Sequence, residues 1–133
     1  MIRRFLISIV CFIVLDAFWL STVAQPFYQQ QLGSLLKPEF LPLPAILFYL
    51  IYLCGLHLFV IQPQQDSKYR QIFAYGMAFG ACCYATFDLT CWSVFNGFPP
   101  IVALVDIVWG STLSGSIALC TILCDRQILS RTS

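Results

Sequence analysis

The fold of this chain is decided by the stretch from Gln71 to Phe95, which reads QIFAYGMAFGACCYATFDLTCWSVF. The stretch contains no lysine, arginine or glutamate. It is long enough to cross the hydrocarbon of a bilayer, which takes about 20 mostly apolar residues in a helix. Gly76 and Gly80 stand four residues apart, a spacing that lets two membrane helices approach closely. We therefore predict a membrane-spanning helix that packs tightly through its glycine face.

Three further apolar stretches predict helices of the same kind. Of all residues, 59% are hydrophobic and only 10% are charged, whereas a soluble domain carries about a quarter charged residues. Gln25-Pro26 is expected to end the first helix, because proline disfavours helix at the residue before it. The segment from Asn96 to Pro100 is expected to form a tight turn. The predicted fold is all-α: a polytopic, four-transmembrane-helix bundle forming a single domain over residues 1–133, with spans at about 2–24, 41–61, 71–95 and 101–124.

The basic residues predict the orientation of this bundle. Six of the seven lysines and arginines flank the spans on one side, and only Lys37 lies on the other. Cytoplasmic segments are enriched in lysine and arginine, so both termini are predicted to be cytoplasmic. The first apolar stretch is too long for a signal peptide and contains Asp16, so we expect an uncleaved helix. The outward connection over residues 25–40 is expected to be either a short helix in the interface or an ordered loop that caps the bundle.

Composition excludes several classes of function. The net charge of +1 gives no reason to expect a nucleic-acid partner. The seven cysteines lie in apolar runs, and the single histidine is His57. This pattern is typical neither of a disulfide framework nor of a zinc site, so we expect no metal and no cofactor. No hydrolase, metalloprotease or nucleotide-binding motif occurs in the chain.

Three aspartates within the predicted spans, Asp16, Asp88 and Asp106, are the main anomaly of the sequence. A charged carboxylate at such a position costs at least a few kcal/mol unless it faces the protein interior or finds a partner. Counted along the helices, all three lie roughly 8–12 Å below the outer boundary. No lysine or arginine lies inside any span, so these acids are either protonated or neutralised by a cation from outside. We expect a shared pocket that opens outward; the alternative is three neutral carboxyls that only hold helices together.

Other side chains at matching depth complete the predicted site. Tyr84 precedes Asp88 by one helical turn on the same face. Tyrosines of the second span are suited to donate to a carboxylate. Of the tryptophans, Trp19 and Trp92 are expected in an interfacial belt, whereas Trp109 lies deeper and is expected to form a pocket wall. The predicted ligand-binding set is Asp16, Asp88, Asp106, Tyr49, Tyr52, Tyr84 and Trp109.

Taken together, these motifs resemble a bacterial membrane-protein family named domain of unknown function 2177. The motifs are Asp16-x-x-Trp19-Leu20, Pro26-Phe27-Tyr28, Phe48-Tyr49, Tyr84-Ala85-Thr86 with Asp88, and Val105-Asp106 with Trp109-Gly110. The resemblance implies a compact four-helix protein of the bacterial inner (cytoplasmic) membrane. It supplies no activity and no catalytic residues. Members are often encoded near lipid-modifying enzymes, which favours a lipid-related role.

Three classes of function stay open. The first, which we favour, is a binding or accessory protein whose partners are membrane lipid, a second copy of the chain or another membrane protein. The second is a small proton- or cation-coupled transporter, although the inner half offers a polar route only hydroxyls, His57 and cysteines. The third is a membrane enzyme acting on lipid, although no nucleophile or metal-binding histidine lies near the acids. Whether the chain is an enzyme is left undecided by the sequence.

Overall fold

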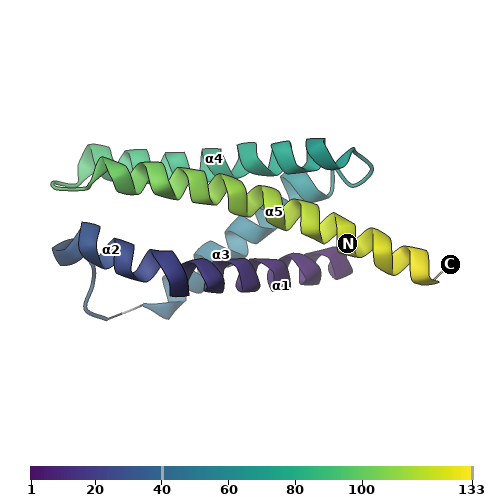
Figure 1. The fold of residues 1–133 in the computed structure, drawn as a ribbon, viewed down its shortest axis with the longest axis horizontal. Coiled ribbons are helices and arrows are strands. Elements are labelled where there is room, and N and C mark those ends of the chain that lie inside the picture. Colours follow the sequence, from purple (N-terminus) through teal and green to yellow (C-terminus); the bar gives the residue numbers. More distant parts are fainter. Residues whose placement is uncertain (40, 133) are drawn as a thin grey trace.

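The computed structural model describes residues 1–39 and 41–132, and in this part the chain is helical apart from short connections (Figure 1). The elements are α1 (Ile2–Trp19), η1 (Leu20–Ala24), α2 (Gln25–Leu32), η2 (Gly33–Leu35), α3 (Pro42–Leu56), η3 (His57–Ile61), α4 (Tyr69–Val94) and α5 (Pro100–Thr132). Four helical segments are long and apolar enough to cross a membrane, namely Ile2–Leu35, Pro42–Ile61, Tyr69–Val94 and Pro100–Arg131. The predicted all-α membrane fold is thereby confirmed. Phe40 and Ser133, which end the predicted connection and the predicted domain, lie outside the described residues.

The prediction that Gln25-Pro26 ends the first helix is wrong. A wide π-helical turn, η1, precedes the proline, and the Gln25 N–H donates to the carbonyl of Leu20, five residues back. Proline has no N–H to donate and its ring crowds the carbonyl four residues earlier. The extra residue in a π turn changes this local hydrogen-bond pattern, so the helix passes through Pro26. Residues 25–35 are therefore helical and continue from α1 (Figure 1), which rules out the ordered loop there.

A second π-helical turn, η3, stands before the other Gln-Pro pair of the chain. The Gln62 N–H donates to the carbonyl of His57 at 2.9 Å, and Pro63 follows. Here the chain leaves the helix and turns toward α4. The predicted turn before α5 is also present, with Gly97 at a φ of 78°, a conformation that glycine adopts without steric cost.

The tightest contact of the bundle joins α4 to α5 through small residues, as predicted. A Cβ added at Gly76 would lie 2.7 Å from the Cα of Gly115 and 2.8 Å from the carbonyl oxygen of Ser114. A Cβ added at Gly80 would lie 2.1 Å from the carbonyl oxygen of Gly110. The two antiparallel helices lie side by side along this seam (Figure 1). Only glycine at these positions permits so close an approach.

The apolar core lies toward the end of the bundle where the N-terminus and the α3–α4 connection are found (Figure 1). Its fully buried members include Leu56 and Ile61 at the end of α3 and in η3, Ile72 in α4, and Ile117 and Ile122 in α5. No residue of the first two and a half turns of α3, residues 42–51, is buried. This N-terminal half of α3 therefore stands apart from α4, and the separation leaves space for the cavity described below.

The fourth helix is longer than predicted. The expected span ended at residue 124, whereas α5 continues to Thr132. Polar residues from Asp125 onward lowered the hydropathy without breaking the helix, and the side chains of Asp125 and Arg126 bond to neighbouring segments. The chain termini and the α3–α4 connection lie toward the same end of the molecule (Figure 1). Six of the basic residues thus share one end, and their cytoplasmic placement stays a prediction.

Candidate functional site

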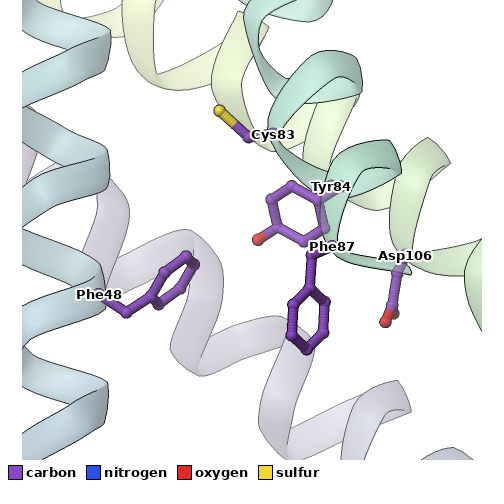
Figure 2. A pocket seen from close by; sticks show the side chains of 5 residues that line it. All are labelled: Phe48, Cys83, Tyr84, Phe87 and Asp106. Atoms are coloured by element: carbon purple, nitrogen blue, oxygen red, sulfur yellow. The ribbon is translucent and has the colours of Figure 1, made fainter. Parts of the chain in front are cut away.

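A cavity of about 470 Å³ lies between α3 and the α4–α5 pair, lined by Phe48, Cys83, Tyr84, Phe87 and Asp106 (Figure 2). Phe48 on α3 and Phe87 on α4 are 49% and 67% exposed, so the mouth opens on the flank of the helices. Asp106 on α5 is only 9% exposed and forms the inner polar end. The volume falls within the range of small-molecule sites. The cavity is therefore apolar at its mouth and acidic at its base.

Asp106 is held by a residue that sequence reasoning placed outside the site. The hydroxyl of Tyr28 on α2 donates to Oδ1 of Asp106. Tyr28 reaches this position because the helix continues through Pro26 into α2, at the end of the bundle away from the chain termini (Figure 1). The signal available in the sequence was the Pro26-Phe27-Tyr28 motif, whose tyrosine is a suitable donor to a carboxylate.

Asp88 is the most secluded of the three aspartates. Its side chain is fully buried and interacts with the carboxyl group of Asp106. Apart from that neighbour, neither oxygen of Asp88 has a hydrogen-bond partner among the described residues. A buried polar group without a partner costs about 1–3 kcal/mol, and more when it is charged. The Asp88–Asp106 pair therefore needs a proton, or a donor from outside the chain.

Asp16, the third of the aspartates, lies on α1 and is half-buried. The hydroxyl of Tyr49 donates to its Oδ2 at 3.3 Å. The indole of Trp109 lies near the same carboxyl group, although its Nε1 makes no hydrogen bond to a described acceptor. Trp109 stacks on Trp19 with ring centroids 4.3 Å apart and planes within 7°. Trp19, expected in an interfacial belt, thus faces the bundle.

Tyr84 connects the two groups of acids. A Cβ at Gly110 would lie 2.1 Å from the Tyr84 ring, which shows how closely the ring packs on α5. From there Tyr84 interacts electrostatically with both Asp16 and Asp106. Tyr52, by contrast, bonds the Oγ of Ser114 at 2.5 Å. Its direct hydrogen bond thus ties α3 to α5.

The predicted residues therefore gather on one side of the bundle, but they do not all line one cavity. Asp106 and Tyr84 line the cavity, Asp88 lies behind Asp106, and Asp16 forms a separate group with Tyr49 and Trp109. Sequence reasoning missed Phe48, Cys83 and Phe87, because an apolar span offers no local signal for which residues border a cavity. Within the described part of the chain, no group of three His, Cys, Asp or Glu side chains is placed to hold a metal ion. What the site offers chemically is a carboxyl group and a tyrosine hydroxyl next to an apolar wall.

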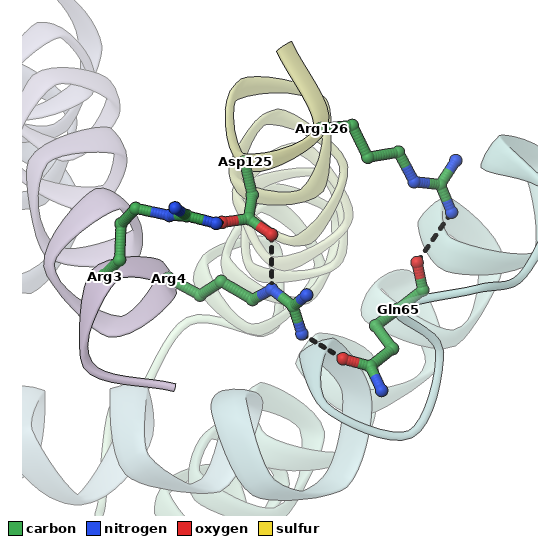
Figure 3. Close-up of polar contacts among 5 residues, drawn as sticks. All are labelled: Arg3, Arg4, Gln65, Asp125 and Arg126. Carbon is green, nitrogen blue, oxygen red and sulfur yellow. Dashed lines mark hydrogen bonds and ion pairs between the residues drawn. The ribbon is translucent and has the colours of Figure 1, made fainter. Parts of the chain in front are cut away.

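A second polar cluster, at the opposite end of the bundle, was also missed (Figure 3). Asp125 on α5 is 1% exposed. Nε of Arg3 donates to its Oδ1 at 2.7 Å, and Nε of Arg4 donates to its Oδ2 at 2.6 Å. Arg4 also donates to the side-chain oxygen of Gln65. The backbone carbonyl of Gln65 accepts from Arg126 at 2.6 Å. This cluster, Arg3–Arg4–Asp125–Gln65–Arg126, ties the N-terminus and the α3–α4 connection to α5.

The comparisons with known proteins agree with this architecture. The family described as predicted membrane protein (DUF2177) matches residues 1–123, and this match confirms the resemblance drawn from the motifs. No curated protein and no solved structure matches the chain.

Proposed function

Since the chain belongs to the DUF2177 family of predicted membrane proteins, we propose a function inside the membrane: a binding or accessory protein that takes up an amphiphilic lipid. The membrane is the inner membrane of a bacterium. The ligand site is the cavity between α3 and the α4–α5 pair. One observation carries the proposal, namely that the cavity has exposed phenylalanines at its mouth and a buried carboxyl group at its base.

The position of the mouth favours a ligand that arrives from the bilayer. Phe48 and Phe87 are exposed on helices long and apolar enough to span the membrane, and such surfaces face acyl chains. A ligand entering between these rings keeps its apolar part against them. Its polar head then meets Asp106 and the hydroxyl of Tyr84. An amphiphile satisfies both ends of the cavity, whereas a purely polar solute would have to cross lipid to reach it.

Transport and lipid enzymology receive less support. A transporter needs a polar route through the other half of the bundle, and there Leu56, Ile61 and Ile117 are fully buried in a packed apolar core. An enzyme of the hydrolase type needs a nucleophile within reach of a base. The thiol on the described cavity wall is that of Cys83, and no described histidine lines the cavity to act as its base.

A pair of adjacent cysteines provides the experiment. Cys83 lines the cavity, whereas its neighbour Cys82 is exposed on another flank of α4. We expect Cys83→Trp to fill the cavity and Cys82→Trp to leave it open, with the same side chain added in both. Each variant is purified in detergent, and its co-purifying lipid is quantified by mass spectrometry alongside binding of a fluorescent fatty amphiphile.

The proposal expects at least a several-fold loss of bound lipid and probe in Cys83→Trp and little change in Cys82→Trp. Circular dichroism and gel filtration establish that both variants are folded and monodisperse. Equal lipid and probe binding by the two folded variants would overturn the assignment of the cavity as the ligand site.

A further inference from the structure

The polar end of the cavity is formed by the carboxyl group of Asp106 and the hydroxyl of Tyr84. Asp106 borders the cavity directly and Asp88 lies against it. The carboxyl group of Asp106 thus faces a ligand head, and the buried carboxyl group of Asp88 lies behind it. Tyr28 donates to one oxygen of Asp106, but neither oxygen of Asp88 receives a donor from the described residues. Apart from the hydroxyl of Tyr84 and the weakly donating thiol of Cys83, the described lining of the cavity offers a ligand no donor.

Basic side chains do not compensate for these acids. In the described part of the chain, the ion pairs formed by arginine are those of Arg3 and Arg4 with Asp125, at the opposite end of the bundle. No lysine or arginine is among the described residues that line the cavity. An anionic head group would meet like charge in a medium of low dielectric constant, where Coulomb repulsion is strong. A phosphate at this site would leave its oxygens without the basic partners that phosphate sites use.

Asp88 gives the independent reason to look for a ligand. Its carboxyl group is fully buried and unpartnered except for a second acid. An ammonium group has three N–H donors and no acceptor, so it can bond more than one carboxyl oxygen at once and neutralise charge in the same place. A hydroxyl head supplies one donor and no charge.

We infer that the ligand of this cavity has a protonated amine as its head group, and that amphiphiles with an anionic head are excluded. The inference rests on the proposed function, because it concerns the head group of the lipid that the cavity would hold. The ammonium group lies against Asp106, with the carboxyl group of Asp88 behind it, and the apolar part lies between Phe48 and Phe87. A hydroxyl head of equal chain length binds in the same position but more weakly.

Four probes test the head group. Dodecylamine, dodecanol and dodecyl phosphate share one chain and differ only in the head, and ethylamine carries the head without the chain. Each competes with a fluorescent fatty amphiphile for the full-length protein in nanodiscs of uncharged lipid. Partition of every probe into empty nanodiscs is measured and subtracted. The expected order is amine, then alcohol, with the amine at least about tenfold tighter than the phosphate, a difference of about 1.4 kcal/mol.

Two variants identify the residues responsible. Asp106→Asn and Asp88→Asn each keep a hydrogen-bonding side chain but lose the ability to carry charge. We expect either change to reduce the preference for dodecylamine over dodecanol toward unity while dodecanol still binds. Asp66→Asn, at an exposed position in the α3–α4 connection, is the control and should preserve the preference. If one of the two buried variants does not fold, the other decides.

The outcomes separate the two proposals. If dodecyl phosphate binds as tightly as dodecylamine, or the amine preference survives in the folded Asn variants, the head-group inference is wrong although a lipid site remains. An amine that binds no better than the alcohol means that the two acids merely share a proton, and the inference is again wrong. If none of the three long-chain probes binds, the proposed function itself fails. If ethylamine binds as tightly as dodecylamine, the site recognises the amine, but the proposed lipid ligand is wrong.

Discussion

Replacing Gly80 by alanine places a methyl group where the packing of α4 on α5 leaves no space. The new Cβ would lie 2.1 Å from the carbonyl oxygen of Gly110 and 2.2 Å from the Oγ of Ser114. Ordinary contact begins at 3.4 Å, so the helices must part locally by 1.3 Å, the difference between 3.4 and 2.1 Å. Because Ser114 also bonds Tyr52 at 2.5 Å, the shift loosens α3 as well.

The size of the effect follows from this displacement. A radial gap of about 0.5–1 Å already forfeits roughly a quarter to a half of the dispersion energy of a contact. Overpacking of a well-packed core costs about 1–3 kcal/mol and occasionally more. The higher helix propensity of alanine opposes this by up to about 1 kcal/mol. We expect Gly80→Ala to lower the free energy of unfolding by about 2–3 kcal/mol.

The matched control is Gly55→Ala in α3, which makes the same chemical change. Its nearest neighbour is the Cζ atom of Phe79 at 3.1 Å, the far end of a side chain that can move. We expect this variant to stay within about 1 kcal/mol of the native protein, in keeping with the helix propensity term. Unfolding by sodium dodecyl sulfate in mixed micelles, followed by circular dichroism, measures both. Equal stability of the two variants would show that α4 and α5 do not pack through Gly80.

Three further predictions concern other parts of the molecule. Reporter fusions at the C-terminus and in the α3–α4 connection should read cytoplasmic and one near Lys37 should read external, because six of the seven basic residues share one side; an external C-terminus would refute the orientation. Asp125→Asn should destabilise the fold by roughly 1.5–3 kcal/mol through loss of charged hydrogen bonds, whereas Asp66→Asn, at an exposed position, should have little effect in the same unfolding assay. Tyr28→Phe removes the hydroxyl that bonds Asp106, so amide hydrogen exchange should quicken in α2 and stay unchanged in α4; unchanged exchange in α2 would show that this bond does not hold the segment.

Local properties of the sequence were sufficient to predict the class of fold. Whether a stretch crosses a membrane depends on its own length and hydropathy, so four helices followed from composition alone. The glycine seam was also predictable, since the spacing of Gly76 and Gly80 places both on one helix face. Counting residues along the helices predicted a similar depth for Asp16, Asp88 and Asp106, and of these the structure shows Asp88 interacting with Asp106.

The tertiary structure decided which of these side chains meet. The local preference of proline predicted that the first helix ends at Gln25-Pro26. In the structure, the Gln25 N–H bonds a carbonyl five residues back in η1, and the helix continues past the proline. This continuation places Tyr28 next to Asp106. Asp125 carried no local signal, because its arginine partners come from the other end of the chain. The cavity beside Asp106 likewise exists because α3 separates from α4. Contacts between distant segments depend on the crossing and rotation of whole helices, which no pattern within one helix specifies.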